Sequence, residues 1–443
     1  MKTLNGYVNY KDSGVEWLEK IPEHWEVKKL KFVTNINPEK LSENTSPDYL
    51  IRYLDISNVE EIDGIGENQE LFFENAPSRA RRIVKDGDTI ISTVRTYLKA
   101  IAYFDNPPAN QIVSTGFAVL RPQKNIYPKF LKWLILSPEF IERVVMHSQG
   151  VGYPAINPSE LANFPIWIPP FSEQLAIANF LDRKTARIDA MIAKYNRLIE
   201  LLNEKRLCLI NQAVTKGLDA STEMKYSGKH WFGNMPKNWK ISRLKNISKV
   251  ILSSVDKHSH ENEESVFLCN YVDVYKNDSI ISELGFMKAT ASAEEIRKFT
   301  LKKNDVLITK DSESWKDIAI SAFVPEDLDN VLCGYHLALV RPNSQCFDGR
   351  YLFYSFQARP INYQLEVEAT GITRYGIDQN AIGNVFILCP PLNEQQNIGI
   401  FLDQKTAQID SLKKGIIRMI TKLQEYRTTL ISETVTGKID VRN

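Results

Sequence analysis

Several features that mark membrane, secreted or metal-binding proteins are missing from this sequence. No apolar run approaches the roughly 20 residues that a membrane-spanning helix needs, and the first residues lack the apolar core of a signal peptide. The five cysteines are scattered without a CxxC pair, so we expect reduced, buried thiols in a cytoplasmic protein that contacts no membrane. His258 and His260 have no further ligands at useful spacing, so we expect no metal site.

Net charge and catalytic signatures are also scarce. The 55 Lys and Arg residues nearly balance 54 Asp and Glu residues, so a polyanion would have to bind at a local patch. No phosphate-binding loop, nuclease carboxylate cluster or nucleophile–base pair is evident. Residues 105–108 read Asp-Asn-Pro-Pro, the core of an amino-methyltransferase motif, but Ala109 stands where an aromatic residue would stack on the base. We therefore expect a chain that is not itself an enzyme and that holds no cofactor.

The chain contains one long stretch twice. Residues 169–219 align without a gap to residues 390–440, and nearly half of the aligned positions are identical. Within each copy, apolar residues recur every seven positions, at Leu181, Ile188, Tyr195, Leu202 and Leu209 and again at Leu402, Ile409, Ile416, Leu423 and Leu430. This spacing predicts two long coiled-coil helices, which we expect to start after a Pro-Pro pair with Ser172 or Asn393 as N-cap.

A shared opening motif extends the duplication to both halves of the chain. The spacing of Gly14, Trp17, Pro22 and Trp25 recurs in Gly228, Trp231, Pro236 and Trp239. We expect these tryptophans to be core anchors. The expected organisation is a globular domain at residues 1–170, a helix at 171–217, a second globular domain at 218–391 and a second helix at 392–443.

Each globular domain is expected to be α+β. Runs rich in β-branched residues at 88–94, 117–120, 306–309 and 337–340 predict strands, and residues 128–147 and 350–368 have helical spacing. Because the two ends of a domain usually lie close together, the second domain should bring the start of the second helix to the end of the first. The two helices should therefore run antiparallel, in a pseudo-twofold internal repeat of domain and helix.

Polar and basic residues follow equivalent predicted strands in both halves. Arg and Lys can contact phosphates and guanine, and hydroxyl groups can add shorter hydrogen bonds. Glycines in the loops after the predicted helices let the backbone approach a phosphate closely. The candidate DNA contacts are Arg79, Arg81, Arg82, Thr93, Arg95, Tyr97, Lys99, Gln149 and Tyr153 in the first half, and Lys310, Ser312, Lys316, Thr373, Arg374 and Tyr375 in the second.

Several motifs together resemble one known family. They are Gly-Val-Glu-Trp-Leu and Ile-Pro-Glu-His-Trp near the start, Pro-Pro-x-x-Glu-Gln before each long helix, Leu-Asp-x-Lys-Thr-Ala-x-Ile-Asp at 181–189 and 402–410, and Val-Thr-Gly-Lys-Ile-Asp-Val at the end. Over essentially its whole length the chain resembles a specificity (S) subunit of a type I restriction–modification system. The resemblance implies two target-recognition domains, each reading one half of a split double-stranded DNA site, joined by two helices.

The resemblance also implies partner subunits. These are two adenine methyltransferase (M) subunits and, beyond them, two ATP-driven restriction (R) subunits, so S-adenosylmethionine, ATP and Mg²⁺ would be used by the partners. Two rival classes stay open. One is a fused methyltransferase–specificity protein seen only in part, and the other is a coiled-coil adaptor whose two heads bind protein rather than DNA.

The long helices are expected to bind partner proteins as well as to set the distance between the two globular domains. Met191, Leu198, Leu412 and Met419 lie one position beside the heptad seam, where a third partner would explain their apolar side chains. The alternative is a broader seam within the helix pair. A rigid pair would also act as a ruler that holds two half-sites about one DNA turn apart.

Overall fold

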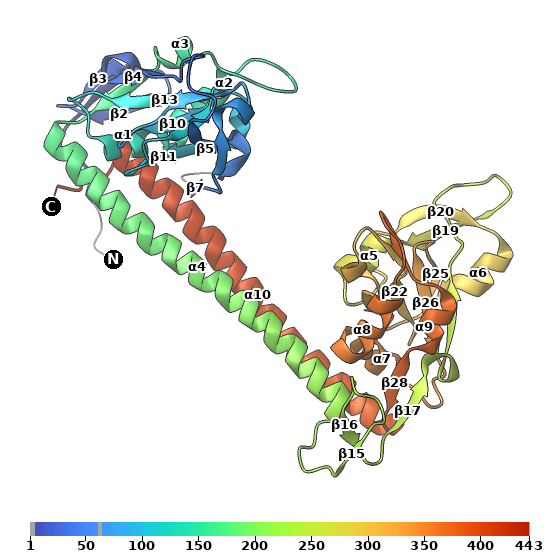
Figure 1. Ribbon diagram of the computed structural model, residues 1–443. Helices are drawn as coiled ribbons and strands as arrows, with labels where there is room; N and C mark the ends of the chain where they lie inside the picture. The colour runs from blue at the N-terminus through green and yellow to red at the C-terminus, as the bar shows by residue number, and fades with distance from the viewer. Residues whose placement is uncertain (1–4, 61–63, 443) are drawn as a thin grey trace. The chain divides into compact units, whose positions relative to one another are not determined.

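The computed structural model describes residues 5–60 and 64–442, which form two compact units. Unit 1 extends to Tyr195 and resumes at Ile417, and unit 2 spans Asn196–Ile416. Two long helices, α4 (Phe171–Lys216, 46 residues) and α10 (Leu392–Val435, 44 residues), each contribute to both units (Figure 1). The rest of each unit mixes strands with short helices, so the α+β expectation is confirmed.

Unit 1 is built around two four-stranded sheets. The first is antiparallel, in the order β4 (Thr34–Ile36), β13 (Phe117–Pro122), β10 (Thr89–Ser92) and β11 (Ile101–Tyr103). The second has the order β8 (Gln69–Phe72), β5 (Leu50–Leu54), β12 (Gln111–Ser114) and β9 (Ala80–Ile83), and its β5 and β12 run parallel. Further elements are β1 (Tyr10–Val15), β2 (Leu18–Pro22), β3 (Glu26–Lys29), β6 (Val59–Glu60), β7 (Gly64–Ile65), β14 (Pro165–Ile168), α1 (Pro128–Ile135), α2 (Pro138–Met146) and α3 (Pro158–Leu161).

Unit 2 is built in the same way. Its antiparallel sheet has the order β18 (Ser248–Leu252), β26 (Leu337–Pro342), β22 (Val306–Thr309) and β24 (Ser321–Phe323). Its second sheet has the order β20 (Met287–Ala291), β19 (Glu264–Cys269), β25 (Leu328–Cys333) and β21 (Thr300–Leu301), with β19 and β25 parallel. Further elements are β15 (Met224–Tyr226), β16 (Asn234–Pro236), β17 (Lys240–Arg243), β23 (Asp311–Ser312), β27 (Tyr375–Gly376), β28 (Phe386–Cys389), α5 (Tyr271–Lys276), α6 (Ala293–Phe299), α7 (Gly349–Gln357), α8 (Arg359–Glu368) and α9 (Gln379–Asn384).

The two units share one topology although the sequences of their interiors share little. The strand orders match, and in each unit a single parallel pair occupies the same place in the second sheet. A buried ion pair recurs as well. Asp88 lies 2.8 Å from Arg121, and Asp305 lies 2.7 Å from Arg341. Burial raises the pKa of the Asp305 carboxyl, and Arg341 partly offsets that effect, so loss of the arginine would leave a buried charge without its partner.

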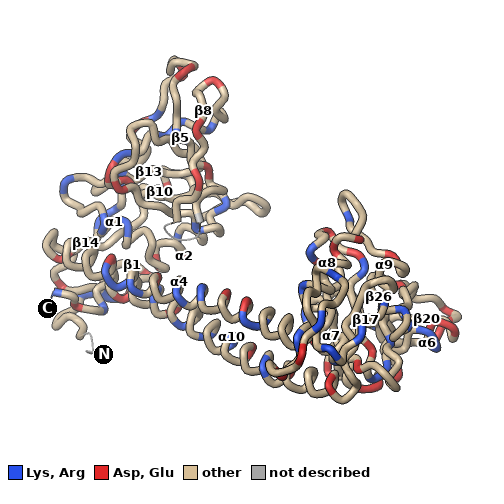
Figure 2. Tube along the Cα trace, turned by 60° about the horizontal axis from the view of Figure 1, so that its bottom comes forward, with Lys and Arg blue, Asp and Glu red and all other residues tan. Residues whose placement is uncertain are grey.

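The heptad seam is the buried stripe of both long helices. Seam positions are buried or half-buried along α4 and α10, because each helix covers the other and, near its ends, a globular core. In unit 1, Leu181 of α4 shares a core with Leu430 of α10, and in unit 2 Ile210 shares one with Leu402. In each unit one end of α4 therefore lies against the opposite end of α10, which confirms the antiparallel prediction. Figure 2 shows residues of both charge signs interspersed along the two helices.

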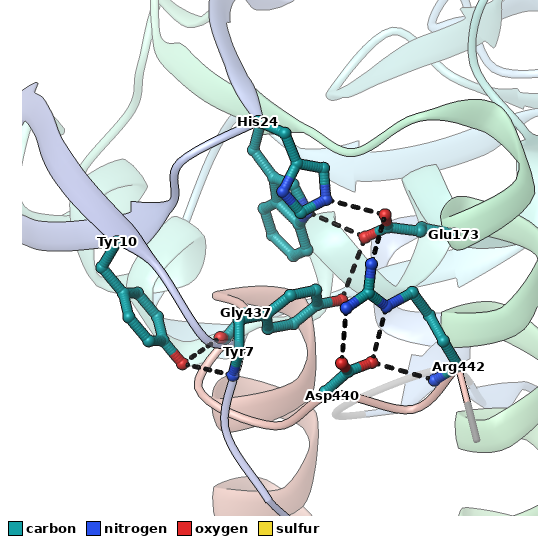
Figure 3. A network of polar contacts seen from close by, with 8 residues as sticks. Tyr7, Tyr10, His24, Glu173, Gly437, Asp440 and Arg442 are labelled. Atoms are coloured by element: carbon teal, nitrogen blue, oxygen red, sulfur yellow. Dashed lines mark hydrogen bonds and ion pairs between the residues drawn. The ribbon is translucent and has the colours of Figure 1, made fainter.

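A buried carboxylate at the start of α4 gathers the first and last parts of the chain in unit 1 (Figure 3). Glu173 is 6% exposed and accepts hydrogen bonds from the Tyr7 hydroxyl (3.1 Å) and Trp25 Nε1 (3.0 Å). His24 Nε2 lies 2.7 Å and Arg442 Nη1 lies 3.5 Å from its other oxygen. Burial, together with the charge of Glu173, raises the pKa of Tyr7, so this hydroxyl remains a donor.

Backbone contacts join the same two ends of the chain. Asp440 N donates to Asn5 O (2.8 Å), and the Tyr10 hydroxyl donates to Gly437 O (3.0 Å). A hydrogen bond from Arg442 lowers the pKa of the Asp440 carboxyl. The residues after α10 are thus an integral part of unit 1.

Three local predictions are wrong. Helices α4 and α10 begin at Phe171 and Leu392, because the carbonyls of the preceding prolines accept the first helical hydrogen bonds, so Ser172 and Asn393 lie inside the first turn and are not N-caps. The helical stretches 128–147 and 350–368 are each broken in two. Pro138 restricts Ser137 before it to extended backbone, and in the second stretch Ala358 is extended while Pro360 lies in the first turn of α8. Cys208 and Cys346 are exposed rather than buried.

Candidate nucleic-acid interface

Two loops that are distant in the sequence lie against each other in unit 1. We call residues 93–99, after β10, the strand-end loop, and residues 149–155, after α2, the Gly loop. Ile156 N donates to Thr93 O (2.9 Å), and the Thr96 and Ser148 hydroxyl oxygens lie 2.7 Å apart. The guanidinium carbon of Arg95 lies 4.6 Å from the centre of the Tyr153 ring. The two loops therefore present one cation–aromatic surface.

Unit 2 has the same pair of loops, with residues 310–316 as strand-end loop and 370–376 as Gly loop. Ile377 N donates to Lys310 O (2.9 Å), and β23 pairs with β27, which joins the two loops by backbone hydrogen bonds. A short 3-10 turn follows the strand in both units, at Thr96–Leu98 and Trp315–Asp317. In both units, therefore, the two loops that carry candidate contacts are adjacent.

Each Gly loop has a backbone shape that its glycine makes possible. Reciprocal hydrogen bonds between Gln149 and Ala155 (both 2.9 Å) close the first loop, and Thr370 and Gly376 (3.0 and 2.9 Å) close the second. Gly150 has φ +112° and Gly371 has φ +146°, a region that L side chains rarely adopt. A Cβ atom would lie 3.2 Å from the Tyr153 carbonyl oxygen in the first loop and collide with the Arg374 backbone in the second.

One carboxylate organises the charged side chains of the unit 2 loops. Asp311 Oδ2 lies 2.9 Å from Lys310 Nζ and 3.1 Å from His336 Nδ1. Arg374 Nη2 lies 3.2 Å from the same His336 nitrogen, and Lys310 Nζ lies 4.7 Å from the centre of the Tyr335 ring. Burial opposes ionisation of Asp311, but the hydrogen bonds from Lys310 and His336 outweigh it and lower the pKa of the carboxyl. Asp311 therefore stays charged and holds the Lys310 and His336 side chains in place.

The three arginines predicted near β9 are held by the second sheet of unit 1. Arg79 Nε donates to the Tyr53 hydroxyl (3.2 Å), and the Arg79 guanidinium pairs with Asp55. The guanidinium carbon of Arg81 lies 4.6 Å from the centre of the Phe73 ring.

Arg82 is the most enclosed of the three. Burial lowers the pKa of its guanidinium, and its Nη2 lies 3.4 Å from Thr115 O. The turn at Thr115 and Gly116 connects this strand to the strand-end loop, because Thr93 Oγ1 donates to Gly116 O (2.9 Å). The turn at Thr115 and Gly116 thus contacts both the arginine segment at β9 and the strand-end loop.

Two predicted contact residues face the protein interior. Thr93 is 5% exposed, and its hydroxyl donates a hydrogen bond to Gly116 O. Ser312 is 7% exposed, and its hydroxyl lies 3.3 Å from both Ser314 N and the Tyr271 hydroxyl. Their side chains position the strand-end loops and do not offer free hydroxyls. The other candidates are accessible in whole or in part: Tyr97, Lys99, Gln149, Tyr153, Lys310, Lys316, Thr373, Arg374 and Tyr375.

Sequence reasoning missed two groups of residues at these loops. Tyr335 and His336 follow Gly334 in the turn between β25 and β26, and so match the turn between β12 and β13 in unit 1. The matching strand order could have pointed to them. Val151 and Ile372, at the tips of the Gly loops, were passed over because an isolated apolar residue in a loop carries no periodic signal.

The apolar residues predicted beside the seam are exposed on the long helices. Met191, Leu198, Leu412 and Met419 are 44%, 41%, 59% and 44% exposed. Leu201, Leu207, Ile417 and Tyr426, which the sequence reasoning did not single out, are exposed as well. The alternative of a broader seam does not account for side chains that the partner helix leaves uncovered.

Two negative findings concern the part of the chain that the structure describes. Within residues 5–60 and 64–442, no helix is both long and apolar enough to cross a membrane. Over the same residues, no group of three or more His, Cys, Asp and Glu side chains is arranged to hold a metal ion.

Comparison with known proteins decides the family. The model for the type I restriction modification DNA specificity domain matches residues 22–201 and again residues 236–422. The chain belongs to this family. It carries the domain twice, as the duplicated sequence and the matching strand orders require. The chain is therefore a DNA sequence-recognition subunit of the type I restriction–modification class.

Relatives agree with this assignment, and solved structures share the fold. A putative type I restriction enzyme specificity subunit, MjaX, from Methanocaldococcus jannaschii is 25% identical over 98% of each chain. The EcoKI specificity subunit of Escherichia coli is 20% identical over 72% of this chain and 68% of its own. A chain from a structure of a type I R-M system complex has TM-score 0.69 at 22% identity and covers 95% of this chain and 99% of its own. The HsdS subunit from Thermoanaerobacter tengcongensis has TM-score 0.54, also at 22% identity, over 95% and 98%.

Proposed function

We propose that each unit of this specificity subunit reads one half of a split double-stranded DNA site through its paired strand-end and Gly loops. The recognition domains would occupy residues 1–170 and 218–391, and the spacer helices residues 171–217 and 392–443. The observation that carries the proposal is the recurrence of one loop pair in both units with different side chains. Equivalent frameworks suit equivalent half-sites, and different side chains suit different bases.

The accessible cations of the loops would supply most of the contacts. Arg95 and Arg374 have the guanidinium geometry that fits guanine or a phosphate, while Lys99 and Lys316 suit phosphates. Tyr97, Gln149, Tyr153, Thr373 and Tyr375 would add polar or stacking contacts. Thr93 and Ser312 would contribute by positioning the strand-end loops, because their hydroxyls form hydrogen bonds within the protein.

The long helices would recruit the enzymes of the complex. The exposed apolar residues Met191, Leu198, Leu412 and Met419 suit two methyltransferase subunits, with two restriction subunits joining beyond them. S-adenosylmethionine, ATP and Mg²⁺ would serve those partners. This chain would supply recognition and assembly and no catalytic group.

Salt dependence of binding tests the proposal. The chain with its methyltransferase partner should bind duplex DNA with a log–log salt slope of about −0.9 for each phosphate contact. A sequence preference should remain when competitor DNA is present. An adaptor with protein-binding heads would show neither the slope nor the preference.

A further inference from the structure

The tips of both Gly loops carry an apolar side chain that is fully in water. Val151 and Ile372 are both exposed over essentially their whole surface. Each directly follows the glycine with positive φ, Gly150 or Gly371, in an equivalent loop. Singly exposed apolar residues are ordinary, but the same exposed β-branched type at the same tip in two diverged units points to a shared use.

The loops hold these tips in place. The reciprocal hydrogen bonds at each loop base, and the bonds from Ile156 to Thr93 and from Ile377 to Lys310, attach the loops to the sheets. The β-branched side chains are themselves stiff at χ1. Each tip is therefore a small apolar projection on a loop that is anchored at its base. Figure 1 shows the first of these loops standing out from unit 1 beside α2.

The surroundings of the tips suit a polyanion. Residues 147–157 contain no Asp or Glu, and Arg95 lies over the Tyr153 ring of that loop. In the second loop Arg374 follows the tip by two residues, and Asp311, the carboxylate opposite Gly376, lies 2.9 Å from Lys310 Nζ. Proteins that bend duplex DNA combine basic residues with an apolar side chain that enters between two base pairs and partly unstacks them. A protein pocket would suit the apolar tip equally, but it would not explain an arginine in the loop pair of both units.

We propose that Val151 and Ile372 are wedges, each of which enters a base step of its own half-site and kinks the duplex there. The inference rests on the proposed function, because it assumes that the loop pairs face DNA. The wedge adds apolar contact and deformation energy at a step that no hydrogen bond reads. Flexible pyrimidine–purine steps are therefore the favoured sites of insertion.

The test uses the full chain without its methyltransferase, so that no base flipped for methylation contributes. Duplexes selected by the chain from a random pool carry 2-aminopurine at successive positions, and their fluorescence rises where stacking is lost. Wild-type protein should raise the signal several-fold at one step in each half-site. Val151→Thr, which keeps the shape of the side chain, should abolish one of these signals, and Ile372→Thr should abolish the other.

Two matched controls and a second readout separate the outcomes. Val8→Thr, at a residue that is 93% exposed away from the loops, and Val367→Thr on α8 should leave both signals unchanged. The tip variants should weaken binding about ten-fold without changing the salt slope, because no phosphate contact is lost.

Specific binding by the wild type with no fluorescence change, or with signals that the tip variants keep, would overturn the wedge alone. Loss of methyltransferase co-purification in the tip variants, with fluorescence unchanged, would overturn it in favour of protein docking. Wild-type binding without sequence preference would count against the proposed function itself.

Discussion

Glu173 and Glu394 occupy the same position at the start of α4 and α10, yet they make different contacts. Glu173 accepts hydrogen bonds from Tyr7 and Trp25 and lies beside the His24 imidazole and the Arg442 guanidinium. Glu394 has Asn238 Nδ2 at 3.5 Å, and the buried indole nitrogen of Trp239 has no hydrogen-bond partner among the described residues. The duplicated motif therefore makes more polar contacts in unit 1, where the start of α4 meets the first and last residues of the chain.

This asymmetry predicts unequal effects of one substitution. Glu173→Gln should lower the free energy of unfolding of unit 1 by about 1–3 kcal/mol, because buried donors lose a charged acceptor. Glu394→Gln, the matched control, should cost much less. Hydrogen exchange of the full chain, read separately over the two units, measures both. Equal losses of unfolding free energy in the two variants would show that the additional contacts of Glu173 do not stabilise unit 1.

The helix surface predicts a partner-binding phenotype. Leu198→Asp combined with Met419→Asp should abolish co-purification of the methyltransferase, because both positions are exposed and a carboxylate would be desolvated in an apolar interface. Tyr226→Asp, at another exposed residue outside the helices, should have no effect. Unchanged co-purification by the double variant, with the fold intact by circular dichroism, would remove these residues from the interface.

Asp311 predicts a dependence of stability on pH in unit 2. Its folded pKa lies below the ordinary value, so its contribution is present above that ordinary value, near pH 4, and is lost as the pH falls through the folded pKa. Asp311→Asn should destabilise unit 2 at neutral pH and reduce the loss of stability in acid. Urea unfolding between pH 3 and 7 measures this. A variant with the wild-type pH profile would show that the carboxylate is not held by Lys310 and His336.

Helix length predicts the spacing between half-sites. Duplicating one heptad in each helix, residues 196–202 in α4 and 417–423 in α10, lengthens both by about 10 Å while keeping the seam in register. The preferred DNA spacer should grow by roughly one to three base pairs, since a turn of about 34 Å holds about 10 base pairs. Neither half-site sequence should change. New bases with an unchanged spacer would show that the helices do not set the distance.

The framework was predictable because it is periodic and duplicated. The seven-residue spacing from Leu181 to Leu209 determines which face of α4 is buried, and the identical motifs before each helix reveal the repeat. Strands such as Val306–Thr309 were found because runs of β-branched residues between turns have few other conformations. The helix breaks at Ser137 and Ala358 were missed because apolar spacing on both sides continued through them.

The candidate site was only partly predictable, because its contacts join residues that are distant in the sequence. The loops at 93–99 and 149–153 were identified separately, but the stacking of Arg95 on Tyr153 depends on how the strands fold. The arrangement of Asp311, His336 and Arg374 has the same origin. The burial of Thr93 and Ser312 was not foreseen, because a hydroxyl residue after a strand serves equally well as a structural hydrogen-bond donor.

Selection of duplexes from a random pool tests the central claim most directly. The complex of this chain with its methyltransferase should select one motif with two separated halves. Arg95→Ala should relax base preference in one half at a cost of about 1–3 kcal/mol, and Arg374→Ala should relax only the other half. Arg197→Ala, an exposed arginine on α4, serves as the control and should change neither half. An undivided motif, or relaxation of the same half by both loop variants, would contradict the assignment of one half-site to each unit.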